Sequence, residues 1–221
     1  SDFESLCRSA ASTKHRGESI GYRGIGFKSV VGLAKTVHVI SGELRATFSR
    51  QRTTADIPQA SRVPLIRIPH PLLASDRKEF DSQLDHLIAD RFNTIFVFDG
   101  LTGSSIESEF AAFDPSALLF LRNVRQLQLT SRVEAVVTVQ RHTDAPGLQS
   151  LRLASSDGVT KWSVMEHDGF AFAFVHDAGG LSRLAEPEAV VHAFLPTHEP
   201  TGFGFKINGD ISTDPSRTRV V

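Results

Sequence analysis

The residues of this chain best suited to chemistry are the glycines of the stretch IGYRGIGFKS, which spans residues 20–29. The stretch holds three glycines followed by an aromatic residue, a lysine and a serine: Gly21, Gly24, Gly26, Phe27, Lys28 and Ser29. Backbone N–H groups in a glycine-rich turn that leads into a helix can hold phosphate, because no side chain obstructs them and the helix dipole favours an anion. The stretch therefore predicts a phosphate-binding loop.

Two common kinds of phosphate loop do not fit this stretch. A Walker A loop has lysine directly after its last glycine, and here Gly21 and Gly26 have the right separation but Phe27 takes the lysine position. A dinucleotide-binding loop would continue from Gly24 and Gly26 with a third glycine at the position of Ser29, and it would follow a strand rather than a polar loop.

The spacing G-x-x-G-x-G-F with Lys-Ser after it resembles the second glycine box of the GHKL ATPases. That superfamily contains gyrase B, histidine kinases, the MutL mismatch-repair proteins and the ninety-kilodalton heat-shock chaperones, and the box is most similar to the chaperone, sacsin and MORC branch. The polar segment with Ser12 and Lys14 resembles the S-x-K sequence that precedes the box in this branch. The segment NTIFVFDG resembles the strand that carries the adenine-side threonine, here Thr94. A segment near the C-terminus resembles one that ends in Ser-Arg, here with Arg217.

The resemblance implies that ATP is the ligand and that Mg²⁺ accompanies it. It implies nucleotide contacts from ten residues and a catalytic contact of Arg217 with the γ-phosphate. The ten residues are Ser12, Lys14, Gly21, Gly24, Ile25, Gly26, Phe27, Lys28, Ser29 and Thr94. ATP would order residues 8–29 as a lid over the nucleotide, and the lid would couple ATP binding and hydrolysis to conformational change and to transient homodimerisation.

Two further parts of a GHKL site would stand upstream of the box. One is a helix with a glutamate that activates water and an asparagine that holds Mg²⁺, and the other is an Asp-x-Gly-x-Gly turn that reads adenine. The opening residues SDFESL resemble the segment directly after that turn, so we expect a fragment with only part of the ATP site. Hydrolysis needs the metal and a positioned water, so we expect the metal ligand outside this chain and no ATP hydrolysis by the chain alone.

The predicted fold class is α+β, a partial GHKL-type α/β sandwich with a mixed sheet and helices on one face, followed by a β-rich segment. We place the ATP-binding part at residues 1–131 and a β-rich transducer or middle-type segment at residues 132–221. The first part is predicted to contain helices at 2–10, 27–35, 75–90 and 113–124, a hairpin at 36–50, and strands at 63–70, 93–100 and 125–131. The second part is predicted to consist of short strands separated by Gly-containing turns.

Three local patterns make these predictions specific. Ser75 is the expected N-cap of helix 75–90, whose buried face would contain Phe80, Leu84, Leu87 and Ile88. Asp114 is the expected N-cap of the next helix, with Pro115 in its first turn. The alternating phenylalanines of one later strand are expected in the core: Phe170, Phe172 and Phe174.

Composition limits the remaining functions. The chain has 221 residues, a net charge of −1 and one cysteine, Cys7, which excludes an internal disulfide framework and favours a reducing, cytoplasmic location. No apolar run has the ~20 residues that a membrane-spanning helix needs. The nine histidines show no metal-ligand spacing, and no nucleophile-elbow motif is present.

Two other functions stay open at this stage. The chain could be a non-catalytic protein-interaction module on a degenerate GHKL scaffold, in which the glycines form an ordinary turn, Thr94 is an ordinary strand residue and Arg217 is a surface residue. A histidine-kinase ATP domain fits less well, because the Gly-Phe-Lys-Ser sequence and the long β-rich extension differ from that branch. The client is undefined, since a sacsin-like protein would remodel proteins and a MORC-like protein would have a DNA-associated partner.

Overall fold

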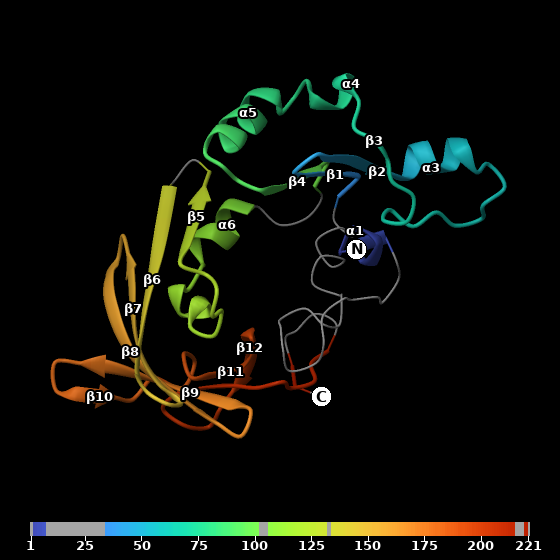
Figure 1. The fold of residues 1–221 in the computed structure, drawn as a ribbon. Helices are drawn as coiled ribbons and strands as arrows, with labels where there is room; N and C mark the ends of the chain where they lie inside the picture. The colour runs from blue at the N-terminus through green and yellow to red at the C-terminus, as the bar shows by residue number, and fades with distance from the viewer. Residues whose placement is uncertain (1, 8–33, 102–105, 132–133, 215–218, 221) are drawn as a thin grey trace. The chain divides into compact units, whose positions relative to one another are not determined.

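The computed structural model describes residues 2–7, 34–101, 106–131, 134–214 and 219–220. The chain forms two compact units, Ser1–Gly103 and Ser104–Val221. Both units contain helices and strands, and the second consists mainly of strands (Figure 1). The predicted α+β class with a β-rich segment is therefore confirmed. The predicted domain boundary at residue 131 lies within the second unit, between two strands that pair with each other.

The first unit contains a four-stranded antiparallel sheet in the order β3-β2-β1-β4. Its elements among the described residues are α1 (Asp2–Cys7), β1 (Thr36–Ser41), β2 (Leu44–Ser49), α3 (Arg50–Asp56), β3 (His70–Pro71), α4 (Ala74–Arg77), α5 (Asp81–Ala89) and β4 (Thr94–Asp99). The predicted helix at 27–35 falls almost wholly outside the described residues.

The predicted hairpin at 36–50 is present as β1 and β2. Ser41 pairs with Leu44, so Gly42 and Glu43 form a two-residue turn. Gly42 has φ 55, a left-handed conformation that glycine adopts without a steric penalty. The hairpin ends at Ser49, whose side chain accepts a hydrogen bond from the backbone N–H of Arg52 at 3.5 Å and so caps α3.

Both faces of β1 are buried, and each is covered by its own apolar cluster. We call the first the α1-side cluster, which contains Ala34, Val37, Val39, Phe48 and Leu65 with Phe3, Leu6, Cys7, Leu44, Ile66 and Phe98 around them. We call the second the α5-side cluster, which contains Ile40, Leu84 and Ile95 with Leu72, Phe80, Leu87 and Val97. Helices α1 and α5 therefore cover opposite faces of this sheet.

The predicted strand at 63–70 is wrong except at its last residue. Only His70 and Pro71 pair with β2, and residues 63–69 run as irregular chain. The segment contains Pro64 and Pro69 and is followed by Pro71, and a proline has no backbone N–H to donate to a neighbouring strand.

The predicted helix at 75–90 is interrupted. Residues 78–80 form a turn between α4 and α5, and the residue at the N-cap position of α4 is Leu73 rather than Ser75. Leu84 is buried as expected, with Phe80 and Leu87 packed beside it, but Ile88 is exposed. The Phe80 ring lies in the interruption and contacts the His38 ring, with centroids 5.1 Å apart.

The second unit contains a mixed sheet in the order β12-β11-β13-β9-β8-β7-β6-β5, with β10 paired to β9. Its described elements are α6 (Ile106–Ala111), the 3₁₀ helix η1 (Pro115–Leu118), β5 (Gln126–Thr130), β6 (Glu134–Ala145), β7 (Leu148–Ser155), β8 (Gly158–His167), β9 (Phe170–Asp177), β10 (Gly180–Ser182), β11 (Val190–Ala193), β12 (Leu195–Pro200) and β13 (Lys206–Asn208). Strands β11 and β13 are parallel, and the other pairs are antiparallel.

The η1 segment packs on one face of this sheet and closes its core. Asp114 caps η1 as predicted, accepting a hydrogen bond from the backbone N–H of Ser116 at 2.8 Å, although the helix is one 3₁₀ turn rather than residues 113–124. The half-buried Arg141 of β6 donates to the carbonyls of Leu118, Leu119 and Leu121 at 2.8–3.1 Å. These three bonds fix η1 to the sheet, and two of the carbonyls, those of Leu118 and Leu121, also accept a backbone N–H.

The predicted core position of the β9 phenylalanines is wrong. Ala171 and Ala173 point into the core, and Phe170 is exposed on the opposite face. Phe172 and Phe174 contact the Phe205 ring, with centroids 6.2 and 4.9 Å away. Alternation showed that the phenylalanines share one face of the strand, but small residues are required on the core face because larger residues from other elements fill that space.

We predict that Ala173→Leu lowers the free energy of unfolding by about 2 kcal/mol, because the Ala173 side chain is 0% exposed and extra methylenes overfill a packed core. Phe170→Ser, on the opposite face of the same strand, should change it by less than about 1 kcal/mol. Urea titration monitored by circular dichroism measures both. A larger loss for Phe170→Ser than for Ala173→Leu would contradict the assignment of the two faces.

Candidate functional site

Of the predicted site residues, only Thr94 lies among the described residues. The other ten lie outside them, and their predicted roles stay predictions: Ser12, Lys14, Gly21, Gly24, Ile25, Gly26, Phe27, Lys28, Ser29 and Arg217. The structure does describe both chain ends that flank the glycine stretch, α1 and the start of β1, together with the strand that carries Thr94.

Thr94 is the first residue of β4 and its side chain is exposed. It pairs in register with Ser41 at the end of β1, and the hydroxyl oxygens of the two residues lie 2.8 Å apart in a hydrogen bond. Two adjacent hydroxyls can each donate and accept, so this pair offers a polar edge to a ligand that carries both kinds of group.

Thr94 shares its face of the sheet with the α1-side cluster. Side chains alternate along a strand, so Thr94, Phe96 and Phe98 project to one side. Phe98 belongs to the α1-side cluster, while the exposed Phe96 lies between it and Thr94, with the two rings stacked 6.4 Å apart. The hydroxyl pair is therefore bordered by an accessible aromatic surface.

Both ends of the glycine-rich segment are fixed beside β4. Cys7 and Ala34, the described residues on either side of 8–33, both belong to the α1-side cluster with Phe98. The backbone N–H of Lys35 donates to the carbonyl of Asp99 at 2.9 Å, which adds a second tie to β4. Thr94 is four residues from Phe98, or about 13 Å along a strand. The ends of the segment are thus held on the Thr94 face of the sheet.

Cys7 is unsuited to nucleophilic chemistry. Burial, with a smaller contribution from the nearby Glu4 carboxylate, raises the pKa of the Cys7 thiol. The thiolate is the reactive form of cysteine, so a raised pKa keeps this side chain unreactive at neutral pH. Its contact with the α1-side cluster is consistent with a packing role.

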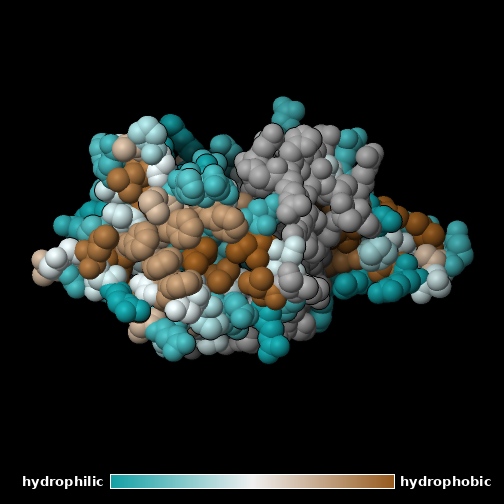
Figure 2. All heavy atoms as spheres, turned by 90° about the horizontal axis from the view of Figure 1, so that it is seen from below, coloured by the Kyte–Doolittle hydropathy of each residue, from teal (hydrophilic) through white to brown (hydrophobic). Residues whose placement is uncertain are grey.

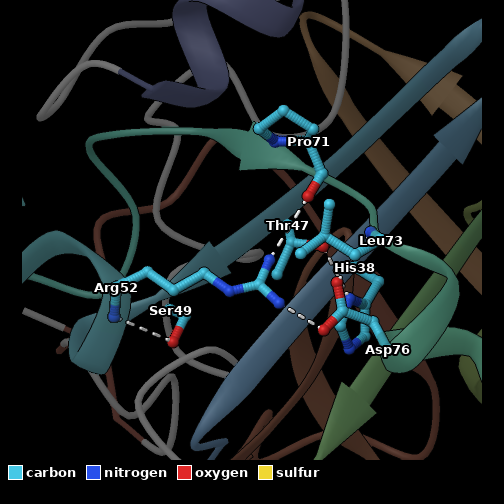
Figure 3. Close-up of polar contacts among 7 residues, drawn as sticks. All are labelled: His38, Thr47, Ser49, Arg52, Pro71, Leu73 and Asp76. Carbon is cyan, nitrogen blue, oxygen red and sulfur yellow. Dashed lines mark hydrogen bonds and ion pairs between the residues drawn. The ribbon is translucent and has the colours of Figure 1, made fainter.

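A polar clamp joins α3 and α4 (Figure 3). The Arg52 guanidinium donates to the carbonyl of Pro71 at 3.3 Å and forms an ion pair with Asp76. Asp76 also accepts the backbone N–H of Leu73 at 2.8 Å. Although burial alone would raise it, the pKa of Asp76 is lowered by the Leu73 hydrogen bond and by Arg52. The carboxylate is therefore held charged between two elements.

The same region contains a buried histidine whose polar group is satisfied. His38 Nδ1 and Thr47 Oγ1 share a hydrogen bond of 2.9 Å, and burial lowers the pKa of His38, with nearby charges contributing less (Figure 3). The side-chain contacts of Arg52 and His38 join one element to another within the fold, so we assign the region a structural role. Sequence analysis missed it because Arg52 and Asp76 are 24 positions apart. The Ser49 cap was the one local signal of α3.

The second unit holds a buried basic pair. His192 of β11 is 0% exposed, and neither of its ring nitrogens has a hydrogen-bond partner among the described residues. Burial, with a smaller effect of the Lys206 ammonium, lowers the pKa of His192 to about 3. Lys206 is also buried, and its Nζ donates to the Glu188 carbonyl at 2.6 Å and lies 3.7 Å from the Asp114 carboxylate. With so low a pKa, His192 is a poor proton acceptor at neutral pH, which argues against a role as general base.

Comparison with known proteins identifies no relative: no protein family, curated protein or solved structure matches the chain. The described residues contain no group of three or more histidine, cysteine, aspartate or glutamate side chains that could hold a metal ion. Among the helices of the described part, none is both long and apolar enough to cross a membrane.

We predict that Asp76→Ala lowers the free energy of unfolding by about 2 kcal/mol, because it removes the Leu73 hydrogen bond and leaves a half-buried Arg52 without its counter-charge. The Asp76 side chain is 13% exposed, whereas that of Asp85, which pairs with Arg77, is 71% exposed. Asp85→Ala should therefore cost less than about 0.5 kcal/mol. Equal losses for the two variants in urea titrations would exclude the clamp.

We predict that acid destabilises the protein partly through His192. Its pKa is about 3 when folded and near 6.5 when unfolded, so the unfolded state takes up the proton first. The stabilisation is complete above about pH 6.5 and is lost as the pH falls toward about 3. His192→Phe keeps an aromatic ring beside Phe120 but does not titrate. From about pH 6.5 to about pH 5, wild type should lose about 2 kcal/mol more than this variant in urea titrations; parallel losses would contradict the assignment.

Proposed function

We propose that this chain is part of a GHKL-type ATP-binding domain of the chaperone, sacsin and MORC kind. Its residues 8–29 would act as a lid that couples nucleotide state to conformational change. ATP hydrolysis is an activity of the intact protein in this proposal, and transient homodimerisation would accompany it. The single cysteine supports a reducing, cytoplasmic location.

One observation carries this proposal beyond the sequence resemblance. The chain enters the glycine-rich segment at Cys7 and leaves it at Ala34, and both residues lie in the α1-side cluster with Phe98 of β4. A loop whose ends are held there starts and finishes on the face that displays Thr94. This arrangement supports a ligand that would reach from the loop to Thr94.

In this proposal, different residues contact the phosphates and the base. Backbone N–H groups at Gly21, Gly24 and Gly26 would donate to phosphate oxygens, with Lys14 and Lys28 adding positive charge. At the other end of the ligand, the hydroxyls of Thr94 and Ser41 would bind polar edge groups of the base, and Phe96 would contact its apolar face.

The described residues do not fit a Mg²⁺ site, because they include no cluster of three metal-type side chains. We therefore assign no hydrolytic step to them. Within the proposal, the metal ligand and the water-activating carboxylate come from polypeptide outside this chain, and Arg217 adds positive charge at the γ-phosphate.

We predict that a non-hydrolysable ATP analogue with Mg²⁺ binds to a longer form that includes any residues encoded before Ser1. Gly24→Val obstructs the backbone cradle and Lys28→Ala removes a phosphate contact, so each should weaken binding more than tenfold, or about 1.4 kcal/mol. Arg125→Ala, an exposed cation of the second unit, is the control and should leave binding unchanged. Isothermal titration calorimetry measures the affinity of the analogue for the unsubstituted longer form and for each of the three variants.

The outcome separates the proposal from its main alternative. No binding by the longer form, or equal binding by all variants, would overturn the ATP site. ATP hydrolysis by the 221-residue chain alone would contradict a divided site. In the first case the non-catalytic interaction module becomes the better interpretation, whereas in the second the chain itself would hold a complete hydrolytic site. One observation favours the interaction module already, since the second unit has exposed aromatic side chains on the outer side of its sheet, among them Phe203 at 57%.

A further inference from the structure

A row of four polar side chains crosses the outer face of the second sheet. Strand register places Gln140 of β6 opposite Arg152 of β7, Arg152 opposite Lys161 of β8, and Lys161 opposite His176 of β9. Residues adjacent to them in sequence, such as Leu151 and Trp162, are buried in the core on the other face. Neighbouring strands lie about 4.8 Å apart, so the row, which we call the cation row, is about 14 Å long.

The cation row places two like charges directly opposite each other. Arg152 and Lys161 are a cross-strand pair, and like charges in such a pair destabilise a sheet. Arg152 has a long contact of 3.5 Å with the amide oxygen of Gln140, and the Lys161 ammonium has no hydrogen-bond or ion-pair partner within the part of the chain that the structure describes. An anion bound between them would offset this repulsion.

An open cavity of about 320 Å³ lies at the row. Its polar lining comes from four adjacent strands: Gln140, His142, Ser150, Arg152, Lys161 and His176. Ser163 Oγ and His176 Nε2 share a hydrogen bond of 2.8 Å, which orients the imidazole. The Asp144 carboxylate accepts a hydrogen bond from Ser150 Oγ at 2.5 Å and lies 3.8 Å from His142 Nε2.

Along the strands, the next row is still mainly polar, and the row after it is apolar. One row pairs Ser150 with Ser163 and Ser163 with Phe174, and the row after it pairs Leu148 with Met165 and Met165 with Phe172. Rows on one face are about 7 Å apart, so Phe174 lies one row from the cations and Met165 lies two rows away, or about 14 Å along the strands. Figure 2 shows apolar side chains gathered on the underside of the second unit, where β9 and β10 lie in Figure 1.

We propose that this face binds a nucleoside phosphate, with the phosphate on Arg152 and Lys161 and the base over the serine and apolar rows. Guanidinium and ammonium groups are strong donors to phosphate oxygens, and a planar base gains from contact with Phe174 and Met165. The phosphate could belong to a free nucleotide or to single-stranded nucleic acid, since both present the same unit. This site uses side chains of the second unit and does not depend on the ATP site proposed for the first.

The anion part of the site is tested by heating the protein in sodium phosphate and in sodium chloride at equal ionic strength. We expect phosphate to raise the Tm of wild type more than that of the double variant Arg152→Ala/Lys161→Ala, which keeps only the general stabilisation that an excluded anion gives. The double variant relieves a repulsion, so it should fold at least as well as wild type in chloride. Arg125→Ala, which removes an exposed cation elsewhere in the second unit, should keep the phosphate effect. The same phosphate effect in wild type and double variant would overturn the proposal.

The base part of the site is tested by fluorescence anisotropy with a labelled thymidine oligonucleotide and unlabelled thymidine monophosphate as competitor. Arg152→Ala and Lys161→Ala should each weaken oligonucleotide binding about tenfold and reduce its salt dependence. Met165→Ala, an exposed position, should weaken it without changing the phosphate effect on Tm.

The competition shows whether the site prefers free nucleotides or single-stranded nucleic acid. Monophosphate competing at the same concentration per phosphate assigns the site to free nucleotides, and a large advantage of the oligonucleotide assigns it to single strands. Polyglutamate of the same charge binding equally well would overturn the proposal, because the base would then contribute nothing. Gly24→Val should leave all these measurements unchanged, so failure here is distinguishable from failure of the ATP site.

Discussion

The first unit depends on the burial of β1 on both faces. Its four inner residues, Val37, His38, Val39 and Ile40, are all almost completely buried, so the sheet needs an apolar layer on each side. Helix α1 and the described ends of the glycine-rich segment provide one layer, and α5 provides the other. This requirement fixes the face on which the segment begins and ends.

The same constraint explains the polar groups around β1. Most buried polar groups have a hydrogen-bond partner, and His38 has one in Thr47 on the adjacent strand. Where β1 ends, the burial ends too, and Ser41 forms its hydrogen bond with the exposed Thr94. The transition from a buried strand to an exposed hydroxyl pair produces the one candidate contact for a base that the described first unit offers on this face.

The two faces of the second sheet carry different kinds of side chain. Small residues of β9 make room for the η1 segment, which Arg141 fixes to the sheet through three carbonyls. The outer face carries the cation row and the aromatic side chains. The two proposed ligand sites differ in chemistry, since the first would rely on glycine backbone N–H groups with added cations and the second on side-chain cations alone. This difference allows point variants to separate them.

The sequence by itself determined the features that depend on neighbouring residues: the hairpin at Gly42, the strand that begins at Thr94, the Asp114 cap and the run of short strands in the second unit. The tertiary structure decided the features that depend on distant residues. Periodicity showed that the β9 phenylalanines share a face, but only packing against η1 determined which face is buried. Arg152 and Lys161 became neighbours only through strand register, and Arg52 and Asp76 only through the path of the chain between them. Local signals define elements, whereas partners across elements are chosen by the burial and pairing of the whole chain.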